Sequence, residues 1–388
     1  MRTSPVPVLI ILAALPGLAR ADAADLLALV QPTRNDAATA VRVDALGFAA
    51  DDFTPAHSIA RTWNAPPTPR DGPNRALGFA RLETSASHGT WSVAVFRRYD
   101  ALGSGTPDTV RFYHALAHPD DLLARDQRLG IDYRFTGFSA DGLRLTRHFS
   151  PAPDQARYAV SLNLLKAGAL RMERATGIAT TAGGVATVNG RRSLLYTGLD
   201  PTPTSQAHLN DFAPVTTGTP SAGWGVSVDL DARWQPRPDL HLSVAANDLL
   251  GRLHWQDVPE MVQDFNGTAW PLQFNQPQAT ARITGANHYR DVTLHLKPKV
   301  AAAAEWSVSP HWQADASLAT VQGVVLPEAG LSWQTTAGPR VRLSYETRFG
   351  SAGVGVRMGP FYAEVRSDRF NLNDAHSLGA RAGLTVAF

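Results

Sequence analysis

The chain has 388 residues, no cysteine and a formal net charge of only +2, with 18% charged and 44% hydrophobic residues. Its mean hydropathy is −0.16, and no apolar run approaches the roughly 18 residues that a spanning helix needs. The basic residues form no block. Composition therefore excludes a helical membrane protein and gives no sign of a nucleic-acid partner.

Residues 1–21 have the features of a secretory signal peptide. Arg2 lies in a short basic region, an apolar core runs over residues 6–14, and Ala19-Arg20-Ala21 is a small-x-small cleavage site. An exported chain with neither a spanning helix nor disulfides is periplasmic, secreted or a β-barrel. Composition also favours a barrel, since half of each strand in a barrel faces a wet interior.

Residues 22–75 show the least regular pattern. One strand fits residues 41–45, whereas residues 64–74 are rich in proline and predict a loop. This segment is interpreted as a plug, a periplasmic lead-in or a disordered leader, and the sequence does not decide among them.

Short runs of alternating apolar and polar residues recur from residue 76 to residue 198, separated by Gly, Asp and Pro. This spacing predicts a β-meander. A short loop helix is expected over residues 119–127 and a long polar loop over residues 200–222. The predicted strands cover 76–84, 90–98, 109–117, 131–137, 143–149, 158–166, 170–176 and 185–196.

The alternation is clearest in the second half. Even-numbered positions from Trp224 to Trp234 are apolar, and odd-numbered positions from Ser227 to Arg233 are mostly charged. Tight turns are predicted at Pro236, at Pro310, at residues 337–338 and at Gly359-Pro360, all at the periplasmic end. Residues 247–291 are predicted to form a long surface loop. The expected membrane-interface aromatics are Trp224, Trp234, Trp306 and Trp312.

Residues 377–388 alternate in the same way, with apolar side chains at even positions and small or polar ones at odd positions. This ending resembles the C-terminal signal of bacterial outer-membrane barrels, which the barrel assembly machinery reads. The matching positions are Arg381, Gly383, Leu384, Val386 and Phe388.

Together these patterns predict an all-β fold, a transmembrane antiparallel up-and-down β-barrel over residues 76–388. A soluble sandwich would alternate too, but strand-end aromatics, the leader and the terminal signal favour a barrel. Both ends of such a barrel face the periplasm, so the strand number should be even, and we expect 14 within a range of 12 to 16. The expected location is the bacterial outer membrane, among its lipids, after signal-peptide removal.

A family resemblance covers residues 240–388. The segments 247–251, 296–300, 312–316 and 353–360 resemble the C-terminal half of TraF/PorV-type outer-membrane proteins, relatives of the FadL-like barrels that take hydrophobic compounds. The first half has no Asn-Pro-Ala hatch motif and no glycine-rich plug sequence. The resemblance implies either solute transport or an accessory role beside an envelope protein partner.

Charged residues alternate with apolar ones on three strands near the C-terminus, which predicts an inward-facing wall of mixed charge. Such a wall either lines a water-filled path or cross-links a blocked interior. Its predicted members are Arg340, Arg342, Glu346, Arg348, Arg357, Glu364, Arg366 and Asp368.

Motifs for chemistry are sparse, and neither a cofactor nor a metal is expected. Residues 137–141 depart from the nucleophile elbow at their last position. His114 and His118 are four residues apart, which would make a metal pair on a helix, but on the predicted strand they would lie about 13 Å apart and are interpreted as lumen or loop histidines. We therefore expect a channel or transporter for small or hydrophobic solutes and not an enzyme. The alternative is a non-conducting accessory barrel of an envelope assembly, conjugation or secretion system.

Overall fold

The computed structural model describes residues 39–56, 67–117, 125–150, 156–197, 223–269, 282–335 and 338–388. The predicted signal peptide, the predicted loop at 200–222 and most of the predicted helix at 119–127 lie outside these residues. No helix in the described segments is both long and apolar enough to cross a membrane.

Strands make up nearly all of the regular structure, and one helix lies between β3 and β4. The bounds are β1 Thr39–Asp51, β2 Asn74–His88, β3 Trp91–Gly105, α1 Pro107–Ala117, β4 Gln127–Phe149, β5 Arg157–Ala182, β6 Val185–Thr197, β7 Gly223–Arg237, β8 Leu240–Ala269, β9 Arg282–His295, β10 Lys299–Ser307, β11 Trp312–Val321, β12 Val324–Gln334, β13 Arg340–Glu346, β14 Ser351–Met358, β15 Phe361–Ser367 and β16 Ser377–Ala387.

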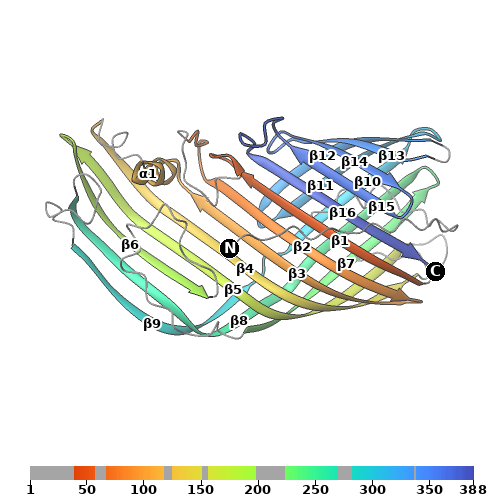
Figure 1. Ribbon diagram of the computed structural model, residues 1–388, viewed down its shortest axis with the longest axis horizontal. Coiled ribbons are helices and arrows are strands. Elements are labelled where there is room, and N and C mark those ends of the chain that lie inside the picture. The colour runs from red at the N-terminus through yellow and green to blue at the C-terminus, as the bar shows by residue number, and fades with distance from the viewer. Residues whose placement is uncertain are drawn as a thin grey trace, which may run out of the picture.

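Fourteen of these strands form a closed antiparallel ring (Figure 1). From β1 to β5 each strand pairs with the next, then β5 pairs with β7, β7 with β8 and β8 with β10. The pairing continues in sequence to β16, which closes the ring against β1. The predicted 14-strand antiparallel barrel is confirmed.

The two remaining strands, β6 and β9, belong to a sheet that rises beyond one rim of the ring. The long strands β5 and β8 continue past their ring partners, β6 pairs with both continuations, and β9 pairs with β8. We call this sheet, formed with the first half of β4, the extension (Figure 1, left).

The two rims differ. The tight β2–β3, β7–β8, β10–β11 and β14–β15 hairpins lie at one rim, where β1 begins and β16 ends. The extension and α1 lie at the other rim, together with the tight β11–β12 turn. Short turns on one side and longer elements on the other are typical of outer-membrane barrels, whose short turns face the periplasm.

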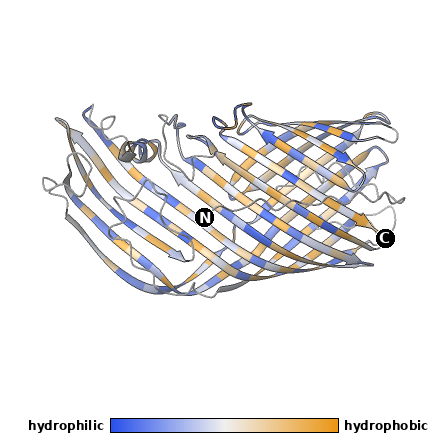
Figure 2. Cartoon of the chain, viewed as in Figure 1, coloured by the Kyte–Doolittle hydropathy of each residue, from blue (hydrophilic) through white to orange (hydrophobic). Residues whose placement is uncertain are grey.

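Hydrophobic and hydrophilic residues alternate along the strands (Figure 2), and in a strand successive side chains point to opposite faces of the wall. On β7, Ser227 and Asp229 are buried inward, whereas Trp224, Leu230 and Trp234 are exposed outward. Exposed aromatics gather at the short-turn rim in the manner of an interfacial girdle. The predicted interface aromatics Trp234, Trp306 and Trp312 lie at this rim. The same rim also carries exposed aromatics outside the predicted set, which are Trp91, Phe149, Tyr158, Trp333 and Phe361.

Two boundary predictions are wrong. Residues 39–51 are β1, a strand of the wall, so the barrel begins inside the segment predicted as a lead-in or plug. Much of the surface loop predicted at 247–291 is strand, because β8 extends to Ala269 and β9 begins at Arg282.

The strand predicted at 109–117 is also wrong, because these residues belong to α1. Thr106 caps the helix, since its hydroxyl oxygen accepts the Thr109 N–H at 3.1 Å, and Pro107 supplies a fixed φ at the first helical position. Phe112 and Ala115 then pack on Leu129 and Ile131 of β4, so helix α1 covers one face of the extension.

Candidate functional site: the barrel lumen

A buried ionic cluster joins the inner faces of β11, β12, β13 and β15. At its centre is Arg342, whose side chain is 1% exposed. Its guanidinium donates to both oxygens of Asp315, at 3.0 and 2.7 Å, and to Glu328 at 2.8 Å. Arg366 donates to Glu328 at 2.8 Å and to Glu364 at 2.6 Å. We call these five residues the Arg342 cluster.

The structure brings only some of the predicted wall residues together. Arg342, Glu364 and Arg366 meet in the Arg342 cluster, whereas Arg340 and Arg357 are half-buried nearer the short-turn rim. The missed members are Asp315 and Glu328. Each lies at an inward position of an alternating strand, so applying the same period to β11 and β12 would have found them.

The other three predicted wall residues lie at the opposite rim and act locally. The Glu346 carboxylate accepts backbone N–H groups of Arg348 and Phe349 in the β13–β14 turn. Arg348 donates to Asp52 at 2.8 Å, and Asp368 accepts the Ser377 N–H at 2.8 Å. These contacts hold turns in place at the rim.

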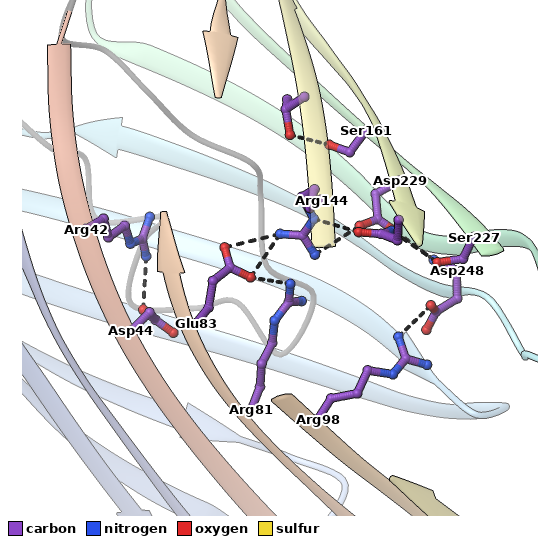
Figure 3. A network of polar contacts seen from close by, with 12 residues as sticks. Arg42, Asp44, Arg81, Glu83, Arg98, Arg144, Ser161, Ser227, Asp229 and Asp248 are labelled. Carbon is purple, nitrogen blue, oxygen red and sulfur yellow. Dashed lines mark hydrogen bonds and ion pairs between the residues drawn. The ribbon is translucent and has the colours of Figure 1, made fainter. Parts of the chain in front are cut away.

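A second buried cluster occupies the opposite half of the lumen (Figure 3). Arg144 of β4 pairs with Glu83 of β2 and with Asp229 of β7, both at 3.1 Å, and its Nε donates to Asn163 of β5 at 2.9 Å. Arg81 pairs with the same Glu83. Of these residues the sequence pattern indicated only Asp229, on the charged face of the 224–234 strand, although each is an inward residue of an alternating strand.

Ion pairs also cross the lumen between walls that are not neighbours. Arg98 of β3 pairs with Asp248 of β8 at 2.6 Å, and Lys299 of β10 pairs with Asp100 of β3. In ring order β3 is third, β8 seventh and β10 eighth, so these contacts join strands four and five places apart in the ring of fourteen. We call Arg98, Asp100, Asp248 and Lys299 the cross-lumen bridge.

The bridge depends on an irregular part of β8. Register shifts lie around Val228 in the pairing of β7 with β8, and Asp248 and Leu250 have φ values of 62° and 52°. A left-handed backbone at a residue other than glycine costs about 1–3 kcal/mol and persists only where the surroundings hold it. The ion pairs of Asp248 stabilise this conformation, and so does the hydrogen bond in which the Asp248 N–H donates to the Asp229 carboxylate at 2.9 Å.

An apolar contact joins opposite walls, nearer the rim of the extension. Phe48, Leu77 and Phe79 of β1 and β2 pack with Val321 and Leu326 of β11 and β12. Counted around the ring, β11 is directly opposite β2. We call this contact the apolar seal. The two walls therefore touch through their own side chains.

A larger apolar cluster lines the inner face where the ring passes into the extension. It includes Phe96, Phe138, Leu165, Leu253 and Trp255. Trp255 is 0% exposed, and its indole N–H donates to the Gly168 carbonyl oxygen at 2.8 Å. Full burial of a tryptophan with its N–H satisfied indicates a tightly packed lining.

The described residues contain no group of three or more His, Cys, Asp or Glu side chains that could hold a metal ion. Ser139 lies at an irregularity of β4, and its hydroxyl oxygen accepts the Ala169 N–H at 2.9 Å within the sheet. His114 is buried in α1, while His118 lies outside the described residues.

The residues of the predicted assembly signal close the ring. Arg381 pairs with buried Asp44 of β1 at 3.0 Å. Gly383 faces the Tyr362 ring, which covers the space that a side chain would occupy. Leu384 and Val386 are outward positions, and the Phe388 side chain is 76% exposed while its N–H donates to the Thr39 carbonyl oxygen. Their role in assembly remains a prediction.

No family model matches this sequence, and no curated protein matches it. Solved structures do. The toluene transporter TodX of P. putida is 8% identical, with 92% of this chain and 91% of that chain covered at a TM-score of 0.47. The Ralstonia pickettii toluene transporter TbuX is 11% identical, with 92% and 90% covered at 0.33.

A Pseudomonas aeruginosa FadL homologue is 8% identical, with 89% of each chain covered at a TM-score of 0.28. None of these structures bears on the TraF/PorV resemblance, which stays a prediction for residues 240–388. The similarities are too weak to carry an argument about activity. The fold itself rests on the strand pairing, which makes this chain a closed 14-strand antiparallel β-barrel with a charged and apolar interior.

Proposed function

We propose that this chain is a bacterial outer-membrane barrel that passes small apolar solutes through a gated lumen. The observation that carries the proposal is the buried apolar cluster on the inner face at the rim of the extension, where Phe96, Phe138 and Trp255 take the place of the polar side chains of a water-filled pore. An apolar lining favours uncharged, hydrophobic solutes over sugars and ions.

The cross-lumen bridge and the apolar seal are the proposed gate. The bridge joins strands that are not neighbours in the ring and the seal joins opposite strands, so a solute moves on only when these contacts separate. Ion pairs that link two parts of the wall can give a gate two distinct states, because the pairs either form completely or separate and leave their charged groups to be solvated by water. The strained backbone at Asp248 and Leu250 favours release of the bridge.

An outer-membrane location follows from the outward face. Apolar residues cover it, a girdle of aromatics marks the short-turn rim, and β1 and β16 meet, so that the fourteen described strands of the ring leave no free edge. These are the physical requirements of a strand-built membrane protein.

The second candidate is the non-conducting accessory barrel. The apolar seal favours it, since a lumen closed by direct packing of opposite walls needs no solute. In that case the barrel would serve as a rigid support for an envelope protein partner bound at the extension.

The two functions differ in whether cells expressing the chain take up apolar solutes faster. The test is uptake of a radiolabelled monoaromatic hydrocarbon by Gram-negative cells with an intact outer membrane, with and without the chain. We expect faster hydrocarbon uptake and unchanged uptake of a small sugar. Equal acceleration of both would indicate a general porin, and acceleration of neither would indicate the accessory role.

A further inference from the structure

The outer face of the wall is hollowed, although the outer surface of a barrel is normally convex. A shallow, largely open hollow of about 890 Å³ spans β2, β3, β4, β5 and β7, and its exposed apolar lining includes Leu82, Val95, Leu143 and Leu164. A second hollow of about 750 Å³ extends it toward β15 and shares Leu82 and Arg97 with the first.

Tight packing on the lumenal side of these strands accompanies the hollow. The Phe96 ring occupies the space beside Gly142 that a side chain would need, and the Arg252 carbonyl oxygen and the Leu253 side chain fill the space beside Gly225. Glycine at both positions lets the wall lie close to the packed interior, which leaves space on the lipid side.

A row of outward polar residues runs along one edge of the hollow. Strand register places Arg97, Asp141, Lys166 and Trp224 side by side on neighbouring strands. Arg97 and Asp141 are 75% and 58% exposed and 3.5 Å apart. Lys166 is exposed and makes no ion pair within the described part of the chain, and Arg252 stacks on the Trp224 ring. Three cations thus face one anion.

The height of this row shows why its charge needs a partner. Trp234 and Trp224 lie ten residues apart on β7, which at about 3.3 Å per residue and a tilt of about 40° is roughly 25 Å, the height of the apolar band. Arg97 lies six residues from Trp91 on β3, only about 15 Å above the lower girdle. The row therefore runs from the level of Trp224, at the extension side of the apolar band, down to Arg97 inside the band, where exposed cations are costly.

We propose that the hollow binds one lipid of the outer leaflet that has a phosphorylated headgroup. Its phosphate lies on the outward side of this row, within reach of Arg97 and Lys166, which flank Asp141, and an acyl chain lies along the apolar lining beneath them. A phosphate neutralises the positive charge that Asp141 alone does not neutralise. The acyl chain of the lipid fills a concave surface against which bulk lipid packs poorly. The proposal rests on the membrane placement of the barrel and not on whether the lumen conducts.

The test is native mass spectrometry of the detergent-purified mature protein after exposure to phosphatidylcholine vesicles with or without lipid A, which carries phosphate groups. We expect one lipid A retained per barrel in preference to phosphatidylcholine. Replacing both basic residues, Arg97→Ala with Lys166→Ala, should weaken retention roughly 30-fold, which corresponds to about 2 kcal/mol for two basic residues near a membrane surface.

Two further variants separate charge from shape. Asp141→Asn should strengthen retention of lipid A, because it removes the competing anion. Val95→Trp should weaken retention without changing charge, because the indole ring takes up space beneath Arg97 that the acyl chain occupies. Arg237→Ala is the matched control, since Arg237 is an exposed cation paired with Asp239 at the opposite rim, and it should leave retention unchanged.

Equal retention of both lipids by all variants would overturn the proposal. A dimer in place of a lipid adduct would also overturn it, since the hollow would then be an interface with a second copy.

Discussion

Replacement of Arg342 by methionine tests how the Arg342 cluster stabilises the barrel. Arg342 is the partner that Asp315 contacts with both oxygens, and it shares Glu328 with Arg366. Without it, one guanidinium faces three buried carboxylates, and Asp315 loses its ion-pair partner. Breaking a buried pair by removing one member costs about 3–5 kcal/mol, so we expect the free energy of unfolding to fall by that amount.

The assay is equilibrium urea unfolding of the barrel in lipid vesicles, followed by tryptophan fluorescence. The double variant Arg342→Met with Asp315→Leu should recover most of the loss, because apolar replacement of a whole buried pair is often neutral. The matched control is Arg237→Ala, whose exposed pair with Asp239 should contribute less than about 1 kcal/mol. A loss below about 1 kcal/mol for Arg342→Met, or no recovery in the double variant, would refute this reasoning.

Four smaller predictions test other parts of the chain. Gly383→Ala should reduce the heat-modifiable folded fraction on gels because its methyl group would meet the Tyr362 ring, whereas Gly47→Ala, with open space around it, should not. Deleting Phe388 should lower the amount of assembled barrel in the outer membrane while export continues, and normal levels would count against the assembly signal. Thr106→Ala should speed hydrogen exchange in α1 through loss of a cap that contributes about 1 kcal/mol, and unchanged exchange would contradict the capping role. Acid should loosen the extension. Burial opposes ionisation of Glu173, but Arg192 and Arg171 outweigh this effect and hold the pKa of Glu173 below its usual value. The stabilisation that Glu173 contributes is therefore present above a pH of about 4.3 and lost as the pH falls through the folded-state pKa, and faster hydrogen exchange of β5 and β6 at decreasing pH would show the loss.

The ring was predictable because its signal is local. Alternation with period 2 identifies a strand without knowledge of its neighbours, and an even strand number follows from the termini of a membrane barrel. The same logic found Arg342, Glu364 and Arg366, whose strands follow one another closely in the sequence. The alternation did not show which of these side chains form ion pairs with one another.

The misses have particular physical causes. In β8, left-handed residues Asp248, Leu250 and Asp257 break the alternation, so a long strand looked like a loop. In α1, apolar residues spaced two apart imitated a strand, although Thr106, Pro107 and Asp108 form a helix start. Contacts across the lumen depend on closure of the ring, and Lys299 and Asp100 are 199 residues apart in the sequence.

The location of β1 also changes how the N-terminal segment can be studied. A deletion of residues 22–75 removes a wall strand, so any effect on conductance would report a broken barrel. A deletion that stops at residue 38 keeps Thr39 and the pairing of β1 with both β2 and β16.

Planar-bilayer conductance of charge-swapped proteins tests the proposed gate most directly. Lys299→Asp and Asp100→Lys each place like charges across the lumen, so each alone should separate the walls and raise open-channel activity above that of the unaltered barrel. The double swap restores opposite charges and should return activity to the unaltered level. Silence in all four proteins, under conditions in which each is folded, would contradict a conducting lumen and favour the accessory role.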